Sequence, residues 1–72
     1  MVNIEKLKEK IVELGYNVEK VAEVINVDRS TMYRKLSGKA DGFTIKEVDR
    51  ICKALNLSKE EAIAIFFTQY VA

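Results

Sequence analysis

Only three residues, Asn26, Val27 and Asp28, separate two short segments whose apolar side chains recur at helical spacing. Residues 18–25 and residues 29–37 each carry apolar positions three or four apart, which predicts an amphipathic helix in each. After glycine, asparagine best tolerates the left-handed backbone that ends a helix, and aspartate is a favoured cap at the start of the next one. Because a connection this short sets two helices at a steep angle, it predicts a helix-turn-helix.

The alanine at position 22 supports a close crossing of these two helices. Ala22 lies in the apolar stripe of the first helix, and a close crossing leaves no room for a larger side chain. Asn17 precedes this stripe and is a candidate N-cap. The helix-turn-helix is therefore expected to span residues 17–37.

A first helix is expected before this unit. Asn3 can cap its start, and Gly15 can supply the left-handed residue that ends it. Its apolar stripe follows steps of three and four residues and consists of Ile4, Leu7, Ile11 and Leu14. The charged residues between these positions form its solvent-exposed face.

Two more helices follow a glycine-containing loop, and both have clear start signals. Thr44 with Glu47, and Ser58 with Glu61, fit the capping-box pattern, in which each side chain caps the backbone of the other residue. The inward-facing residues expected for these helices are Ile45, Val48, Ile51, Cys52 and Leu55, then Ala62, Ile63, Ile65, Phe66 and Phe67. The chain is therefore expected to form one all-α domain of five helices over residues 1–72.

The composition disfavours catalysis. The 72 residues include no histidine and one cysteine, Cys52, so there is no imidazole base, histidine-based triad or histidine metal ligand. Cys52 lies in an apolar stripe, where cysteine packs as a small hydrophobic residue. We therefore expect no enzymatic activity, no metal and no cofactor. The longest apolar run, residues 62–67, is too short for a membrane span and no signal peptide is evident, so the cytoplasm is the expected location.

Positive charge is concentrated in residues 29–39. That segment has no acid and four cations, which are Arg29, Arg34, Lys35 and Lys39. Because the whole chain has a net charge of +1, the remaining residues sum to −3. A nearly neutral chain whose cations gather on one helix and the following loop has the electrostatic pattern of a nucleic-acid-binding domain.

The segment 17–39 resembles the helix-turn-helix of the phage repressor and Cro-type family, also called the xenobiotic-response-element type. It reads Asn17-Val-Glu-Lys-Val-Ala-Glu-Val-Ile-Asn-Val-Asp-Arg-Ser-Thr-Met-Tyr-Arg-Lys-Leu-Ser-Gly-Lys39. The shared pattern is a capping residue, an apolar-alanine pair, a turn, a Ser-Thr-apolar helix and a Gly-Lys ending. The resemblance implies a five-helix lambda-repressor-like bundle, with helix 29–37 in the major groove. It also implies a sequence-specific, double-stranded DNA-binding transcriptional regulator of the phage or mobile-element repressor type.

The second helix of the motif presents a polar face suited to base reading. At 100° per residue, Met32 and Leu36 share the buried face, and Ser30 and Arg34 lie opposite. Arg29, at the first helical position, leans toward the helix N-terminus, which enters the groove in this motif. The residues expected to read bases are Arg29, Ser30, Thr31, Tyr33 and Arg34, and those expected to contact phosphate are Asn17, Lys20, Lys35, Ser37 and Lys39.

Val18 and Glu19 depart from the family pattern. Family members often have glutamine at the first position of the motif's first helix, where it contacts phosphate. Val18 cannot make that contact, and Glu19 adds a negative charge beside it. The amides of the helix N-terminus can still hold a phosphate. The alternative function is a protein-interaction module, antirepressor-like or antitoxin-like, on the same fold without DNA binding.

The C-terminal segment is more apolar than a helix with a single buried stripe requires, and the surplus residues are Phe67, Tyr70 and Val71. They can either close the core of the monomer or form a homodimer interface. A homodimer, formed in solution or only on DNA, would read two half-sites about one helical turn apart, roughly 34 Å. The sequence indicates no membrane partner and no small-molecule ligand.

Overall fold

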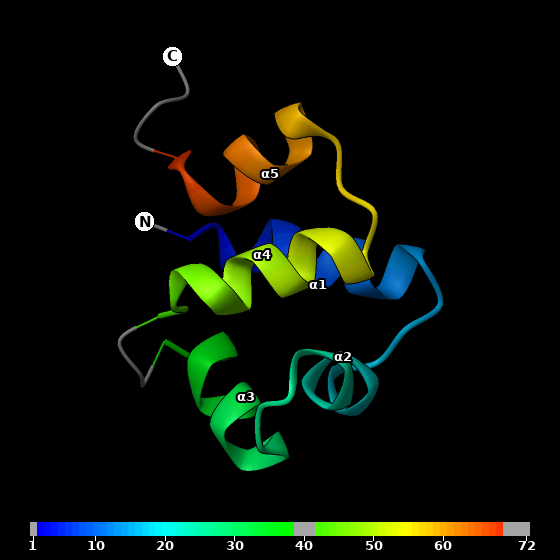
Figure 1. Ribbon diagram of the computed structural model, residues 1–72, viewed down its shortest axis with the longest axis vertical. Coiled ribbons are helices and arrows are strands. Elements are labelled where there is room, and N and C mark those ends of the chain that lie inside the picture. The colour runs from blue at the N-terminus through cyan, green and yellow to red at the C-terminus, as the bar shows by residue number, and fades with distance from the viewer. Residues whose placement is uncertain (1, 39–41, 69–72) are drawn as a thin grey trace.

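Five helices and their connecting loops make up the computed structural model (Figure 1). It describes residues 2–38 and 42–68, and these residues contain no strand. In chain order the helices are α1 (Ile4–Glu13), α2 (Val18–Ile25), α3 (Arg29–Leu36), α4 (Ile45–Ala54) and α5 (Lys59–Phe66). The expected all-α fold of five helices is confirmed.

Figure 1 shows α2 and α3 at one end of the molecule and α5 at the other, with α4 and α1 between them. Helix α2 packs against both α3 and α4, and α1 packs against α5. Every helix contributes to one hydrophobic core, which consists of Leu7, Ile11, Val21, Ala22, Ile25, Met32, Leu36, Ile51, Leu55, Ile65 and Phe66. This shared core holds α2 and α3 on the rest of the domain.

Both expected capping boxes are present. The Thr44 hydroxyl accepts the Glu47 amide at 3.1 Å, and the Thr44 amide donates to the Glu47 carboxylate at 2.8 Å. Ser58 and Glu61 form the same reciprocal pair at 3.1 Å and 2.9 Å. Each box satisfies amides that have no partner inside the helix, which explains why α4 and α5 begin where the sequence predicts.

Three apolar residues expected to face inward do not. Ile45 is 89% exposed, because it occupies the first position of α4 and no described residue covers that turn. Leu14 is 41% exposed. It is the C-cap of α1 and no longer has helical backbone angles, so its side chain does not continue the buried face of the helix. Phe67 is 42% exposed and likewise follows the last helical residue of α5.

An ion pair joins α1 to α5. The Lys10 ammonium lies 2.6 Å from the Glu61 carboxylate. At the start of α1, the Asn3 amide donates to the Ile65 carbonyl of α5, also at 2.6 Å. The hydrogen bond from Lys10, together with that from the Ser58 amide, lowers the pKa of Glu61 from its ordinary value of 4.5 to about 2.

Glu61→Gln is expected to flatten the dependence of stability on pH. Because the folded-state pKa of Glu61 is depressed, its carboxylate stabilises the fold above its unfolded pKa, and this contribution is lost as the pH falls from 4.5 through 2. Glutamine keeps an oxygen for the Ser58 amide but cannot form the ion pair with Lys10. Thermal unfolding across this pH range should show a smaller fall in Tm for the variant, and an equal fall in both proteins would contradict the assignment.

Candidate nucleic-acid interface

The turn between α2 and α3 has the backbone that its sequence predicts. Asn26 is left-handed, with φ 61° and ψ 46°, and its amide donates to carbonyls in the last turn of α2. The Val27 amide donates to the Ala22 carbonyl at 2.9 Å. The Asp28 carboxylate then accepts the Ser30 amide at 3.0 Å and so caps α3. One helix therefore ends and the next begins within three residues.

Buried contacts fix how α3 sits on α2. Ala22 is 2% exposed and Met32 has no exposed surface, so the small and the large side chain are both enclosed in the core. Arg50 of α4 donates a hydrogen bond of 3.0 Å to the Ile25 carbonyl at the end of α2. The sequence pattern does not identify Arg50, because a basic residue on a helix does not reveal which distant carbonyl it reaches.

The outward face of α3 is the one expected. Ser30 and Arg34 are exposed, while Met32 and Leu36 are buried in the core. Arg29 is exposed at the first position of the helix, and Thr31, half-buried, flanks the exposed face. A polar face with two arginines is therefore presented to solvent along the helix that follows the turn.

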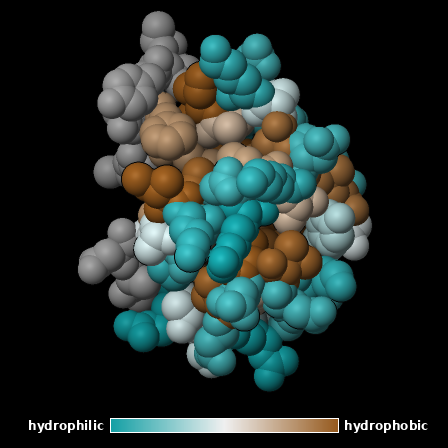
Figure 2. Space-filling model, in the orientation of Figure 1, coloured by the Kyte–Doolittle hydropathy of each residue, from teal (hydrophilic) through white to brown (hydrophobic). Residues whose placement is uncertain are grey.

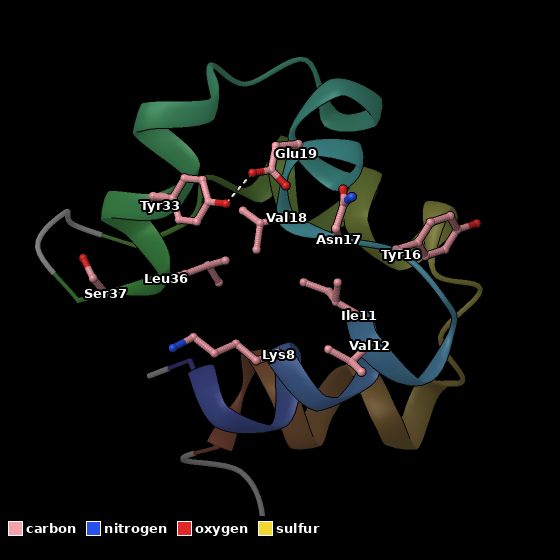
Figure 3. Close-up of a pocket in the computed structure, with 10 residues that line it drawn as sticks. All are labelled: Lys8, Ile11, Val12, Tyr16, Asn17, Val18, Glu19, Tyr33, Leu36 and Ser37. Carbon is pink, nitrogen blue, oxygen red and sulfur yellow. Dashed lines mark hydrogen bonds between the residues drawn. The ribbon is translucent and has the colours of Figure 1, made fainter.

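Tyr33 and Glu19 join the two helices of the motif at their surface. The Tyr33 hydroxyl donates a hydrogen bond to the Glu19 carboxylate (Figure 3). This hydrogen bond lowers the pKa of Glu19, with further contributions from the Glu19 amide and the nearby charge of Arg29. The same bond raises the pKa of Tyr33. The negative charge that the sequence places at the start of α2 is thus held against Tyr33 and Arg29.

Lys35, unlike Arg34, is held by groups that follow α3 in the chain. Its ammonium donates to the Gly42 carbonyl at 2.6 Å and lies 3.3 Å from the Glu47 carboxylate, with the Lys35 side chain only 12% exposed. It also lies 5.5 Å from the centre of the Phe43 ring. Partial burial opposes ionisation of Glu47, but the Thr44 amide and Lys35 outweigh it and the pKa of Glu47 is lowered. Lys35 therefore ties the end of α3 to the start of α4.

The other expected phosphate contacts are distributed over both helices. The Asn17 side chain accepts the Lys20 amide at 2.8 Å and so caps α2. The Lys20 ammonium lies 3.7 Å from Glu23, and both side chains are exposed. The Ser37 hydroxyl donates to the Arg34 carbonyl at 3.0 Å. Lys39 lies outside the described residues.

The helix-turn-helix lies within a segment that matches a known protein family. Residues 6–66 match the Cro/C1-type HTH DNA-binding domain, a stretch that contains α2, the turn and α3 whole. The chain belongs to this family. Searches of curated proteins and of solved structures found no match. The HTH domain is therefore a DNA-binding domain, and the resemblance to repressor and Cro-type proteins is confirmed.

The described part of this HTH domain contains neither a candidate membrane span nor a cluster of candidate metal ligands. In residues 2–38 and 42–68, no helix is long and apolar enough to cross a membrane. Within the same residues, no three acidic or cysteine side chains come together as metal ligands would. Of the three residues expected at a dimer interface, Phe67 is exposed, and Tyr70 and Val71 lie outside the described residues.

Proposed function

We propose that this HTH domain is a sequence-specific transcriptional regulator of the phage or mobile-element repressor type, which reads duplex DNA with α3. The observation that carries the proposal is the outward face of α3. Arg34 and Ser30 are exposed there, and in the described part of the chain the Arg34 guanidinium has no hydrogen-bond or ion-pair partner. An unpaired guanidinium is free to form two hydrogen bonds with guanine O6 and N7 in the major groove.

The neighbours of Arg34 on α3 have supporting roles in this proposal. Arg29, at the helix start, reaches the base pairs next to those read by Arg34, and the Ser30 and Thr31 hydroxyls contact either base edges or phosphate. Tyr33 lies at the flank of the same face, held by Glu19, where its ring can contact a thymine methyl group or a phosphate.

Phosphates are proposed to contact the N-terminus of α2 and the end of α3. The Val18 amide, beside the Asn17 cap, has no hydrogen-bond partner among the described residues. At the N-terminus of a helix, such a free amide can donate a hydrogen bond to a phosphate. Lys20, Ser37 and Lys39 complete the proposed set. Lys35 would join it only after leaving Glu47, so its main proposed role is to position the loop that follows α3.

The salt dependence of binding tests this function. The full chain is titrated into labelled duplexes selected from a random library, at several salt concentrations. We expect the logarithm of the binding constant to fall linearly with the logarithm of salt concentration, with a slope of about −0.9 for each phosphate neutralised. No duplex binding at low salt would contradict the proposal and favour the protein-interaction module.

The homodimer is also proposed, and an apolar surface supports it. Ile45 and Phe67 are exposed, and both border a shallow depression of about 140 Å³ that Val2, Phe43, Val48 and Phe66 complete. Figure 2 shows hydrophobic side chains on this edge of the molecule, where α4 begins and α5 ends. A two-fold pair would double the phosphate contacts and supply the second half-site. Tyr70 and Val71, which lie outside the described residues, belong with Phe67 to the proposed dimer interface.

Two copies are expected on one palindromic duplex with half-sites about one helical turn apart. Sedimentation of the complex at saturating protein measures the stoichiometry. Ile45→Gln should leave the monomer fold intact, because the side chain is 89% exposed, and should shift the complex toward one copy per duplex. Val12→Gln is the matched control, since Val12 is 73% exposed on α1. A one-to-one complex of the unaltered protein would contradict the dimer.

A further inference from the structure

A groove separates α1 from the helix-turn-helix, and Figure 3 shows the side chains that line it. Its volume is about 450 Å³, which is in the range of small-molecule sites. Ile11 of α1 and Leu36 of α3 line it and are only 2% and 4% exposed, so the groove reaches the hydrophobic core. Val18, half-buried at the start of α2, adds a third apolar surface.

Polar and aromatic groups border this apolar floor (Figure 3). Lys8 extends along the α1 wall, and its ammonium has no hydrogen-bond or ion-pair partner in the part of the chain that the structure describes. Glu19, on the opposite wall, already accepts the hydrogen bond of Tyr33. Tyr16 lies at the end near Asn17. The groove therefore offers apolar surface, two tyrosine side chains, a carboxylate already paired with Tyr33 and one unpaired positive charge.

We propose that this groove binds a small aryl carboxylate, with its rings against Ile11, Val18 and Leu36 and its carboxylate paired with Lys8. The apolar floor selects a hydrophobic ring system, because such burial removes apolar surface from water. Because Glu19 already accepts the hydrogen bond of Tyr33, the Lys8 ammonium is the charged group left to pair with a ligand, and it favours an anion over a neutral or cationic ligand. Size selects a small molecule over a protein, because stable protein interfaces bury on the order of 1,200 Å² or more.

Occupation of the groove would affect DNA binding, a consequence that rests on the proposed function. Asn17, Tyr33 and Ser37 line the groove and also belong to the proposed DNA-contacting set. A ligand between α1 and α3 competes with DNA for contacts to these side chains. Binding of the ligand and of DNA are then coupled, and each weakens the other by the same factor.

The test uses 2-naphthoate as the probe, titrated into the full chain while backbone amide and methyl NMR signals are recorded. We expect saturable shifts centred on Ile11, Val18 and Leu36. Val24 and Ile45, which are exposed and apolar but lie outside the groove, serve as reference signals. Shifts that do not saturate, or that are as large at the reference residues, would overturn the proposal. A groove that serves only a protein partner would give that negative result.

A matched pair of lysine substitutions tests the carboxylate contact. Lys8 and Lys6 are both exposed on α1 and unpaired among the described residues, but only Lys8 lines the groove. Lys8→Gln should raise the Kd of 2-naphthoate by about 2- to 5-fold, as expected for an exposed ion pair, and should not change the Kd of neutral 2-naphthylmethanol. Lys6→Gln should change neither. Equal effects of the two substitutions would overturn the pairing with Lys8.

Duplex titrations with and without 2-naphthoate test the coupling separately. The Kd for duplex should rise in the presence of the ligand, and less so for Lys8→Gln at the same ligand concentration. An unchanged duplex Kd at saturating ligand would overturn the coupling. If the chain binds no duplex while 2-naphthoate still shifts the groove signals, the proposed function fails and the ligand site is upheld.

Discussion

Arg34→Ala is expected to weaken binding to a specific duplex by about 5- to 150-fold, which corresponds to ~1–3 kcal/mol. The side chain is exposed on the face of α3 opposite Met32 and Leu36, and no described residue pairs with its guanidinium. Alanine therefore removes the proposed pair of hydrogen bonds to guanine while leaving the buried core unchanged. Fluorescence anisotropy measures the affinity, and thermal unfolding should give a melting temperature within a few degrees of that of the unaltered protein.

Two control variants separate base reading from a general effect of charge. Arg34→Lys keeps the positive charge but loses the planar, bidentate donor, so it should keep non-specific binding and lose most of the preference at the base pair that Arg34 reads. Lys59→Ala removes one positive charge from the exposed start of α5 and should change little. If Arg34→Ala unfolds the domain while its folded fraction binds normally, Arg34 is structural and the proposed reading face is wrong.

Met32→Ala is expected to lower the free energy of unfolding by about 2–5 kcal/mol. The Met32 side chain has no exposed surface and is the more deeply buried of the two side chains that α3 contributes to the core, the other being Leu36. Truncation leaves a cavity that the short helices around it cannot fully close. A domain of this size has a total free energy of unfolding near the lower end of ~5–15 kcal/mol, so the substitution should remove a large share of it. Urea denaturation of the variant and of the unaltered protein measures this loss.

Met32→Leu is the matched control for this prediction. It conserves volume closely and should cost less than about 1.5 kcal/mol. Two positions on α3 then have separate effects, since Met32→Ala lowers the free energy of unfolding and Arg34→Ala lowers the affinity for DNA. A loss below 1 kcal/mol for Met32→Ala would mean that α3 is not anchored through this side chain.

The helix boundaries and the turn could be predicted from the sequence because short-range chemistry determines them. Thr44 and Ser58 satisfy amides only three residues away, and Asn26 takes the left-handed backbone that few residues tolerate. The orientation of α3 is similarly local, because Met32 and Leu36 are its only large aliphatic residues. These features need no knowledge of which helix packs on which.

The features that the sequence could not predict depend on tertiary partners. Periodicity places Ile45 on the inner stripe of its helix, but exposure depends on whether another element covers that turn, and none of those described does. Lys35 belongs by sequence to a cationic cluster, yet Glu47 and Gly42 hold it after the chain has turned back. Glu19 and Tyr33 lie fourteen residues apart and meet only because α2 and α3 cross.

The groove between α1 and the helix-turn-helix cannot be predicted from the sequence, because it too depends on tertiary packing. Ile11 and Leu36 are both typical core residues in the pattern, and nothing local shows that the space between their helices stays open. Lys8 likewise has the spacing of an ordinary solvent-exposed lysine. Only the arrangement of α1 against the helix-turn-helix (Figure 3) places this unpaired cation beside an apolar floor.

Parallel selection of bound sites from a random duplex library tests the central claim, that the outward face of α3 reads the DNA sequence. The unaltered protein and Arg34→Ala are each taken through the same rounds at the same salt concentration. The unaltered protein should enrich a motif that contains an invariant guanine, and Arg34→Ala should relax the preference at that position while keeping the rest of the motif. Enrichment of no motif by the unaltered protein, or of an identical motif by both, would contradict the claim.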